Sequence, residues 1–103
     1  MGVRISLSSM ITTTGEVDLF PIPDHYIAFV RRLSVSNGAA EPAIVQLIFY
    51  NGDARKPVLT LKVAPDQTLT LGDENLPVEA CPTKIAISTD KQPLMVDLSL
   101  DLE

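Results

Sequence analysis

The last stretch of the chain, Leu94-Met95-Val96-Asp97-Leu98-Ser99-Leu100-Asp101-Leu102-Glu103, decides its fold class. Aliphatic side chains occupy every second position from Leu94 to Leu102, and Met95 and polar residues occupy the positions between them. Successive side chains of a strand point to opposite faces, so this alternation predicts a strand with one face in a core and the other in solvent.

The same alternation recurs toward the amino terminus, interrupted by turn residues such as Gly15, Asn37-Gly38 and Asn51-Gly52-Asp53. No window shows helical spacing, and eight prolines oppose long helices. We predict strands at Val3–Ser8, Glu16–Phe20, Tyr26–Ser36, Ala43–Tyr50, Val58–Val63, Thr68–Leu71, around Leu76 and Val78, at Lys84–Thr89 and at Leu94–Glu103. The pattern indicates an all-β protein: a single antiparallel β-sandwich domain over residues 1–103, with about seven to nine strands in jelly-roll or immunoglobulin-like order.

Three strands have features that break simple alternation. A bulge at Arg31-Arg32 would align the apolar residues on either side of it and place both arginines at the surface. The run Ala43–Tyr50 is apolar on both faces, which is typical of a central strand covered on both sides. Pro57 lacks a backbone donor, so we expect the strand after the Asn51-Gly52-Asp53 turn to begin only at Val58, following a loop of several residues.

Composition excludes several classes of partner. Of the 103 residues, 46% are hydrophobic and 20% are charged, which is typical of a packed domain. The net charge of −5 disfavours binding to nucleic-acid phosphates, because no basic stripe is present to displace counterions. No apolar run is long enough for a membrane span, and the single cysteine cannot close an intrachain disulfide. We therefore expect no nucleic-acid partner and no membrane partner.

The residues that could carry catalysis or bind metals are few. Cys81 is the only thiol and His25 the only imidazole, and Cys81 lies in a turn, where a free cysteine is usually a small apolar residue. Asp73, Glu74 and Asn75, with Asp66 nearby, offer too few oriented oxygens for calcium, and their positions are typical of a polar hairpin turn. We expect no catalytic residues, no metal and no cofactor, and hence no enzyme.

Two kinds of binding surface remain open. Sugar-binding sandwiches stack pyranose rings on exposed aromatic side chains, but this chain has no tryptophan, and most of its two tyrosines and three phenylalanines fall within strands. The segment Phe20-Pro21-Ile22-Pro23 is apolar without a period that would bury it. It therefore fits an extended contact with another chain as well as a loop folded back on the sandwich.

From Tyr26 onward, the order of parts resembles small bacteriophage virion β-sandwich proteins, a class that includes capsid decoration (cement), neck and tail accessory proteins. The resemblance lies in strands and turns that are ordered as follows: Phe29-Val30-Arg31-Arg32-Leu33-Ser34-Val35-Ser36-Asn37, then Ile44–Tyr50 and Val58–Val63, then Ala64-Pro65-Asp66-Gln67-Thr68-Leu69-Thr70-Leu71, then Leu76–Ala80 and the final alternating strand. It implies a protein that acts by surface complementarity, so it assigns no functional residue.

The leading interpretation is a structural virion protein, a phage capsid decoration protein that binds the outside of the shell and stabilises it. The expected partner is the major capsid protein or another virion protein, contacted through Phe20, Pro21, Ile22 and Pro23 and the first strand. The unusual apolar content for one core also favours a homo-oligomer, for example a trimer. Such a protein would be made in the host cytoplasm and would end at the capsid surface. The alternatives are a tail or neck accessory protein and a glycan-binding module.

Overall fold

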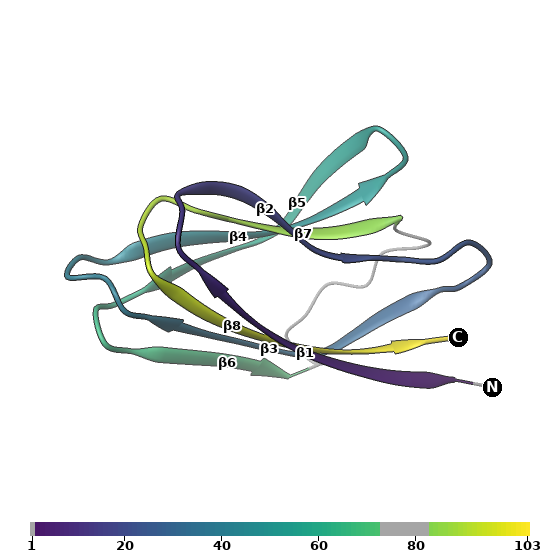
Figure 1. Cartoon of the computed structure of the whole chain (residues 1–103), viewed down its shortest axis with the longest axis horizontal. Helices are drawn as coiled ribbons and strands as arrows, with labels where there is room; N and C mark the ends of the chain where they lie inside the picture. Colours follow the sequence, from purple (N-terminus) through teal and green to yellow (C-terminus); the bar gives the residue numbers. More distant parts are fainter. Residues whose placement is uncertain (1, 73–82) are drawn as a thin grey trace.

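The computed structural model describes residues 2–72 and 83–103, which form eight strands in two packed sheets (Figure 1). The strands are β1 (Val3–Ile11), β2 (Gly15–Pro21), β3 (Ala28–Asn37), β4 (Ala43–Asn51), β5 (Ala54–Val63), β6 (Thr68–Gly72), β7 (Lys84–Thr89) and β8 (Leu94–Leu102). All paired strands are antiparallel, so the expected all-β sandwich is confirmed. The predicted strand around Leu76 and Val78 and the predicted turn at residues 73–75 lie outside the described residues.

The strand order is that of a jelly roll rather than an immunoglobulin-like sandwich. One sheet, which we call sheet A, has the order β1-β8-β3-β6, and the other, sheet B, has the order β2-β7-β4-β5. The pairs β4:β5, β3:β6, β2:β7 and β1:β8 follow one another outward from the central hairpin, as in a long two-stranded ribbon that is folded over on itself. This arrangement defines the eight-stranded jelly roll.

The core lies between the inner faces of the two sheets, and β8 contributes a buried side chain at every second position along its length. Its aliphatic residues are all at most 5% exposed, whereas Met95, Asp97 and Glu103 are exposed on the other face. The predicted alternation of the last strand is therefore confirmed. The largest fully buried side chains are distributed over both sheets: Leu33, Val35, Leu94, Val96, Leu98 and Leu100 in sheet A, and Val45, Leu47, Ile48, Val63, Ile85 and Ile87 in sheet B.

A bulge in β3 brings two arginines to the surface, as the sequence predicts. The register between β3 and β8 shifts between Val30 and Arg32, so that Val30 pairs with Leu100 but Arg32 pairs with Ser99. Ala28, Val30, Leu33 and Val35 are consequently all buried, while Arg32 is exposed and Arg31 half-buried. Without the extra residue, one of the two apolar pairs flanking the arginines would face solvent.

The predicted wide hairpin after β4 is wrong. Asn51 pairs with Ala54 across a two-residue turn, where Gly52 has a φ of 63°. Pro57 lies inside β5 and pairs with Ile48, beside a register shift between Leu47 and Ile48. Because β5 is an edge strand, a residue without a backbone donor can be accommodated there without breaking an internal ladder.

The two-sided covering that was predicted for β4 is found over only part of the strand. Ile48 faces outward and is fully buried, together with its cross-strand partner Ala86 on β7. Ile44, which faces the same way near the start of the strand, is 41% exposed. The outer face of sheet B is thus covered by side chains near the end of β4 and open near its beginning.

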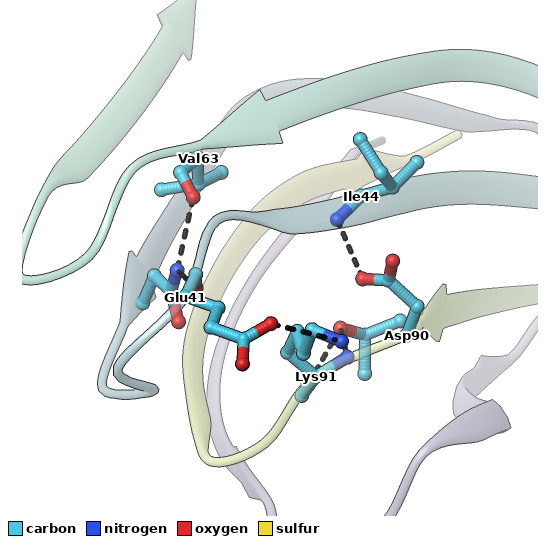
Figure 2. A network of polar contacts seen from close by, with 7 residues as sticks. Glu41, Ile44, Val63, Asp90 and Lys91 are labelled. Atoms are coloured by element: carbon cyan, nitrogen blue, oxygen red, sulfur yellow. Dashed lines mark hydrogen bonds and ion pairs between the residues drawn. The ribbon is translucent and has the colours of Figure 1, made fainter.

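Polar contacts fix the loops that follow β3 and β7 (Figure 2). The Asn37 side chain is 2% exposed, and its amide donates to the carbonyls of Glu41 and Val63, both at 2.9 Å. The backbone N of Ile44 donates to Asp90 Oδ1 at 2.7 Å, and Lys91 pairs with Glu41 at 3.5 Å. A buried amide that is fully satisfied in this way favours a single loop conformation at this end of the sandwich.

We expect Leu98→Ala to destabilise the domain by about 2–5 kcal/mol, because it leaves a cavity at a site that is 1% exposed in the centre of sheet A. Asp97→Ala and Ser99→Ala, on the opposite face of the same strand, should change the free energy of unfolding by about 0.5 kcal/mol or less. Urea unfolding of the three variants measures the difference. Equal effects at positions 97 and 98 would contradict the two-faced character of β8.

Candidate functional site

The segment predicted to contact a partner is partly inside the core. Ile22 is 7% exposed, and its backbone N donates to the carbonyl of Thr83 at 2.9 Å. Phe20 is half-buried and packs against the core, whereas Pro21 and Pro23 are exposed. Of the two alternatives that the sequence left open for this stretch, Ile22 follows the loop folded back on the sandwich. A partner contact by Phe20, Pro21, Ile22 and Pro23 stays a prediction, with Pro21, Pro23 and the open part of Phe20 accessible to a partner.

The loop that follows, residues 22–27, has a defined shape. The backbone N of Tyr26 donates to the carbonyl of Pro23 at 3.3 Å, and His25 adopts a φ of 71°, which closes a tight turn. Ile27 then exchanges two backbone hydrogen bonds with Glu103, at 2.7 and 2.9 Å. The loop is thus fixed at one end by the core position of Ile22 and at the other by pairing with the end of the chain.

This loop presents apolar side chains to solvent at one end of the sandwich. Tyr26 is 41% exposed and Ile27 40%, and the surface between Ile22 and Thr83 is hollowed to a volume of about 270 Å³. The loop lies at the same end as both chain termini (Figure 1), where Val3, paired with Leu102, is 47% exposed. An apolar group of this kind on a fixed loop is a candidate contact surface.

Sequence reasoning missed Tyr26 and Ile27 because it placed them in the strand that contains Arg31-Arg32. The strand begins only at Ala28. The run Pro23-Asp24-His25 contains two strong turn residues, and this signal could have moved the start of the strand past Ile27.

A second candidate is a polar hollow of about 720 Å³ on the outer face of sheet A, which we call the arginine hollow. Asp101 lies between two guanidinium groups, bonded to Arg4 and, at 2.8 Å, to Arg31 Nε. The hydrogen bond from Arg4 and then that from Arg31 hold the pKa of Asp101 below its ordinary value of 3.8. Arg32 lines the same hollow, and Arg31 also lies 5.5 Å from the centre of the Phe29 ring.

A third polar group crosses sheet B from edge to edge. Glu16 on β2 accepts hydrogen bonds from the Tyr50 hydroxyl and, at 2.7 Å, from Arg55 Nε. These two bonds lower the pKa of Glu16, and the Glu16 bond raises that of Tyr50. Lys84 lies 4.2 Å from the centre of the Tyr50 ring and pairs with Asp18. The Tyr50 ring is therefore already covered by a cation and is not a free stacking platform for a sugar.

The residues considered for catalysis or metal binding are not brought together in the described part of the chain. Cys81, Asp73, Glu74 and Asn75 lie outside it. His25 is exposed on the 22–27 loop, and Asp66 is exposed in the turn before β6, with its backbone N bonded to the carbonyl of Asn37. Over residues 2–72 and 83–103, no group of three or more His, Cys, Asp or Glu side chains could hold a metal ion.

The same residues include no helix that is long and apolar enough to cross a membrane.

No protein-family model matches the chain, and no curated protein matches its sequence. Solved structures match its fold. One is a structure of Bacillus endospore appendages, which form a novel family of disulfide-linked pili. It matches with a TM-score of 0.59 and 12% identity over 99% of this chain and 84% of that one. PirA matches with a TM-score of 0.55 and 18% identity, over 95% of this chain and 93% of its own. The Anabaena sensory rhodopsin transducer matches with a TM-score of 0.51 and 20% identity, over 88% of this chain and 78% of its own.

At these identities the similarity shows a shared fold and does not carry function across. The infectious bursal disease virus protein also contains a matching region, but with a TM-score of 0.49 over 31% of that chain it supports no conclusion. A two-sheet sandwich found in pilus and other proteins is what the comparisons establish. Membership of the bacteriophage class stays a prediction from the sequence.

Acid should expose the contribution of Asp101. Because its folded pKa lies below its ordinary value, its stabilising effect is present above about pH 4 and is lost as the pH falls through the folded pKa. Asp101→Asn should therefore lower the melting midpoint at neutral pH and flatten its decline between about pH 5 and pH 2. Thermal melts across that range measure how steeply the melting midpoint falls with pH in the parent and in the variant. If the midpoint of Asp101→Asn falls as steeply as that of the parent, the two arginine contacts have no stabilising role.

Proposed function

We propose that this protein is a structural component of a virus particle, a phage capsid decoration protein that attaches to the outside of the shell through residues 22–27. The observation that carries the proposal is an exposed pair of apolar side chains, Tyr26 and Ile27, on a loop anchored at both ends. A contact surface that is already ordered loses little conformational entropy on binding. The assignment to phage rests on the resemblance of the strand and turn order.

A structural role agrees with the rest of the molecule. The two sheets form a jelly roll, an architecture that viral capsid proteins use, and a pilus protein shares the two-layer fold. Both observations concern architecture, and the same jelly roll is also found in lectins, so the fold is consistent with attachment without requiring it. A tail or neck accessory protein would use the same loop on a different virion component.

The arginine hollow favours a second candidate, a glycan-binding module. It is the larger of the two hollows described above and is lined by arginine, aspartate and serine side chains, which suit hydroxyl-rich or anionic sugars. Phe29 is the aromatic residue beside it, and Arg31 already lies against that ring. A glycan-array signal that is lost in Arg32→Ala and kept in Tyr26→Ser would favour this candidate over shell attachment.

The double variant Tyr26→Ser/Ile27→Ser should abolish binding to particles while keeping the fold, because both side chains point to solvent and the backbone bonds of Ile27 are retained. Particles assembled without the protein are mixed with purified variant and sedimented, and the bound protein is quantified per shell subunit. The matched control is Ile44→Ser, which removes an apolar side chain of the same exposure, 41%, at the start of β4. This control should bind normally.

Melting midpoints separate loss of contact from loss of fold. The double variant and Ile44→Ser should melt within a few degrees of the parent, whereas Ile22→Ser should melt much lower because Ile22 is a core residue. Normal particle binding by the folded double variant would refute attachment through residues 22–27.

A further inference from the structure

Four strand edges are open within the described residues: β1 and β6 in sheet A, and β2 and β5 in sheet B. An open edge presents unpaired backbone donors and acceptors and can pair with a strand of another chain. Natural sheets usually blunt such edges by short length, bulges, prolines or charged side chains. The four edges of this sandwich differ sharply in that respect.

Three of the edges are blunted. The β6 strand has only five residues. In β5, Pro57 and a register shift interrupt the ladder, and Arg55, Lys56 and Lys62 add charge. In β2, the register shifts between Asp18 and Phe20, and the strand ends at Pro21. Each of these features disfavours regular pairing with a further strand.

The β1 edge is not short, has no bulge and no proline, and carries a single charged side chain. Its nine residues pair with β8 without a register shift, and they include neither proline nor glycine. The only charged residue is Arg4, which is bonded to Asp101 on the neighbouring strand. At about 3.4 Å per residue the strand offers a straight edge of about 30 Å.

The edge also carries the most exposed apolar side chains. Among the large hydrophobic residues that the structure describes as exposed, Met10 at 56% and Val3 at 47% have the highest values, and both belong to β1. Ile5 and Leu7 are half-buried on its inner face. A second strand along this edge would cover inner-face residues that the sandwich itself leaves partly open.

The sequence of β1 is complementary to itself. When two copies are paired antiparallel about Leu7, Val3 faces the partner's Ile11 and Ile5 faces the partner's Ser9, all on the inner faces. On the outer faces, Ser6 meets the partner's Ser8 and Arg4 meets the partner's Met10. Every residue from 3 to 11 is paired and no like charges meet. In a parallel, in-register pairing Arg4 would oppose the partner's Arg4, which is unfavourable.

We propose that two copies of this chain form a two-fold dimer by antiparallel pairing of their β1 strands about Leu7, which joins the two A sheets into one continuous sheet. Such an interface is isologous and closes on itself. This contact gives a dimer, whereas a trimer was one example of the homo-oligomer expected from the sequence. This inference does not depend on the proposed function, because the loop of residues 22–27 takes no part in the pairing.

The opposition of Arg4 and the partner's Met10 makes the register testable by sedimentation equilibrium of the full chain between about 1 and 300 μM. Met10→Lys places like charges opposite each other twice in every dimer and should raise the dissociation constant about tenfold. Met10→Glu places a carboxylate opposite Arg4 and should leave the dissociation constant unchanged or lower it. The control is Met95→Lys, which adds the same charge beside Met10 on β8 but away from the edge, and it should have little effect.

The outcomes test the dimer, its register and its pairing edge once circular dichroism has shown that the variants are folded. A parent protein that remains monomeric throughout the range overturns the dimer. Equal weakening by Met10→Lys and Met10→Glu overturns the register about Leu7. If Met95→Lys weakens the dimer as strongly as Met10→Lys, copies meet through the outer face of sheet A and edge pairing is overturned. Tyr26→Ser/Ile27→Ser should dimerise like the parent, so failure of particle binding and failure of dimerisation can be told apart.

Discussion

The position of β8 between β1 and β3 is the constraint on which the rest of the sandwich depends. Nine consecutive residues of β8 pair with β1, and the same strand pairs with β3 on its other side, so the last strand joins the first to the third. Its aliphatic face is at most 5% exposed, and burial of each such side chain contributes about 1.5–3 kcal/mol. Once β8 is in place, β3 must carry an extra residue at Arg31 to keep both of its apolar halves facing the same core. The bulge, and with it the arginine hollow, is therefore a consequence of that pairing.

Much of this fold could be predicted from the sequence, because alternation of apolar and polar residues is the signature of a strand with one solvent-exposed face. For that reason the sequence predicted β8, most of β3 and the bulge within β3. The choice between jelly roll and immunoglobulin-like order was not predictable, since strand pairing depends on long-range contacts that leave no local signal. The length of the hairpin loop after β4 was mispredicted because the position of a strand within its sheet decides whether a proline such as Pro57 is tolerated, and the sequence did not show that β5 lies at an edge.

The candidate contact surface shows a different limit of pattern reasoning. Phe20 to Pro23 has no period, so the sequence left open whether these residues contact another chain or fold back on the sandwich. At the end of a sandwich, however, the space between the sheets is open, and a connecting segment that crosses it can fill the space with a single side chain, as Ile22 does. Having placed Ile22 inside, the same loop turns at His25 and leaves Tyr26 and Ile27 outside. Exposure in such a loop is set by the shape of the turn rather than by periodicity.

The two proposed contacts constrain each other through the geometry of β1. Val3 lies at the end of the sandwich that carries residues 22–27, because Val3 and Ala28 both pair with Leu102 while Ile27 bonds to Glu103. Antiparallel pairing of two β1 strands brings the Val3 end of one copy beside the Ile11 end of the other, so the two loops come to lie at opposite ends of the dimer. The two loops of such a dimer are too far apart to bind one site together. If both proposals hold, each dimer would present its two loops to two separate sites rather than to one.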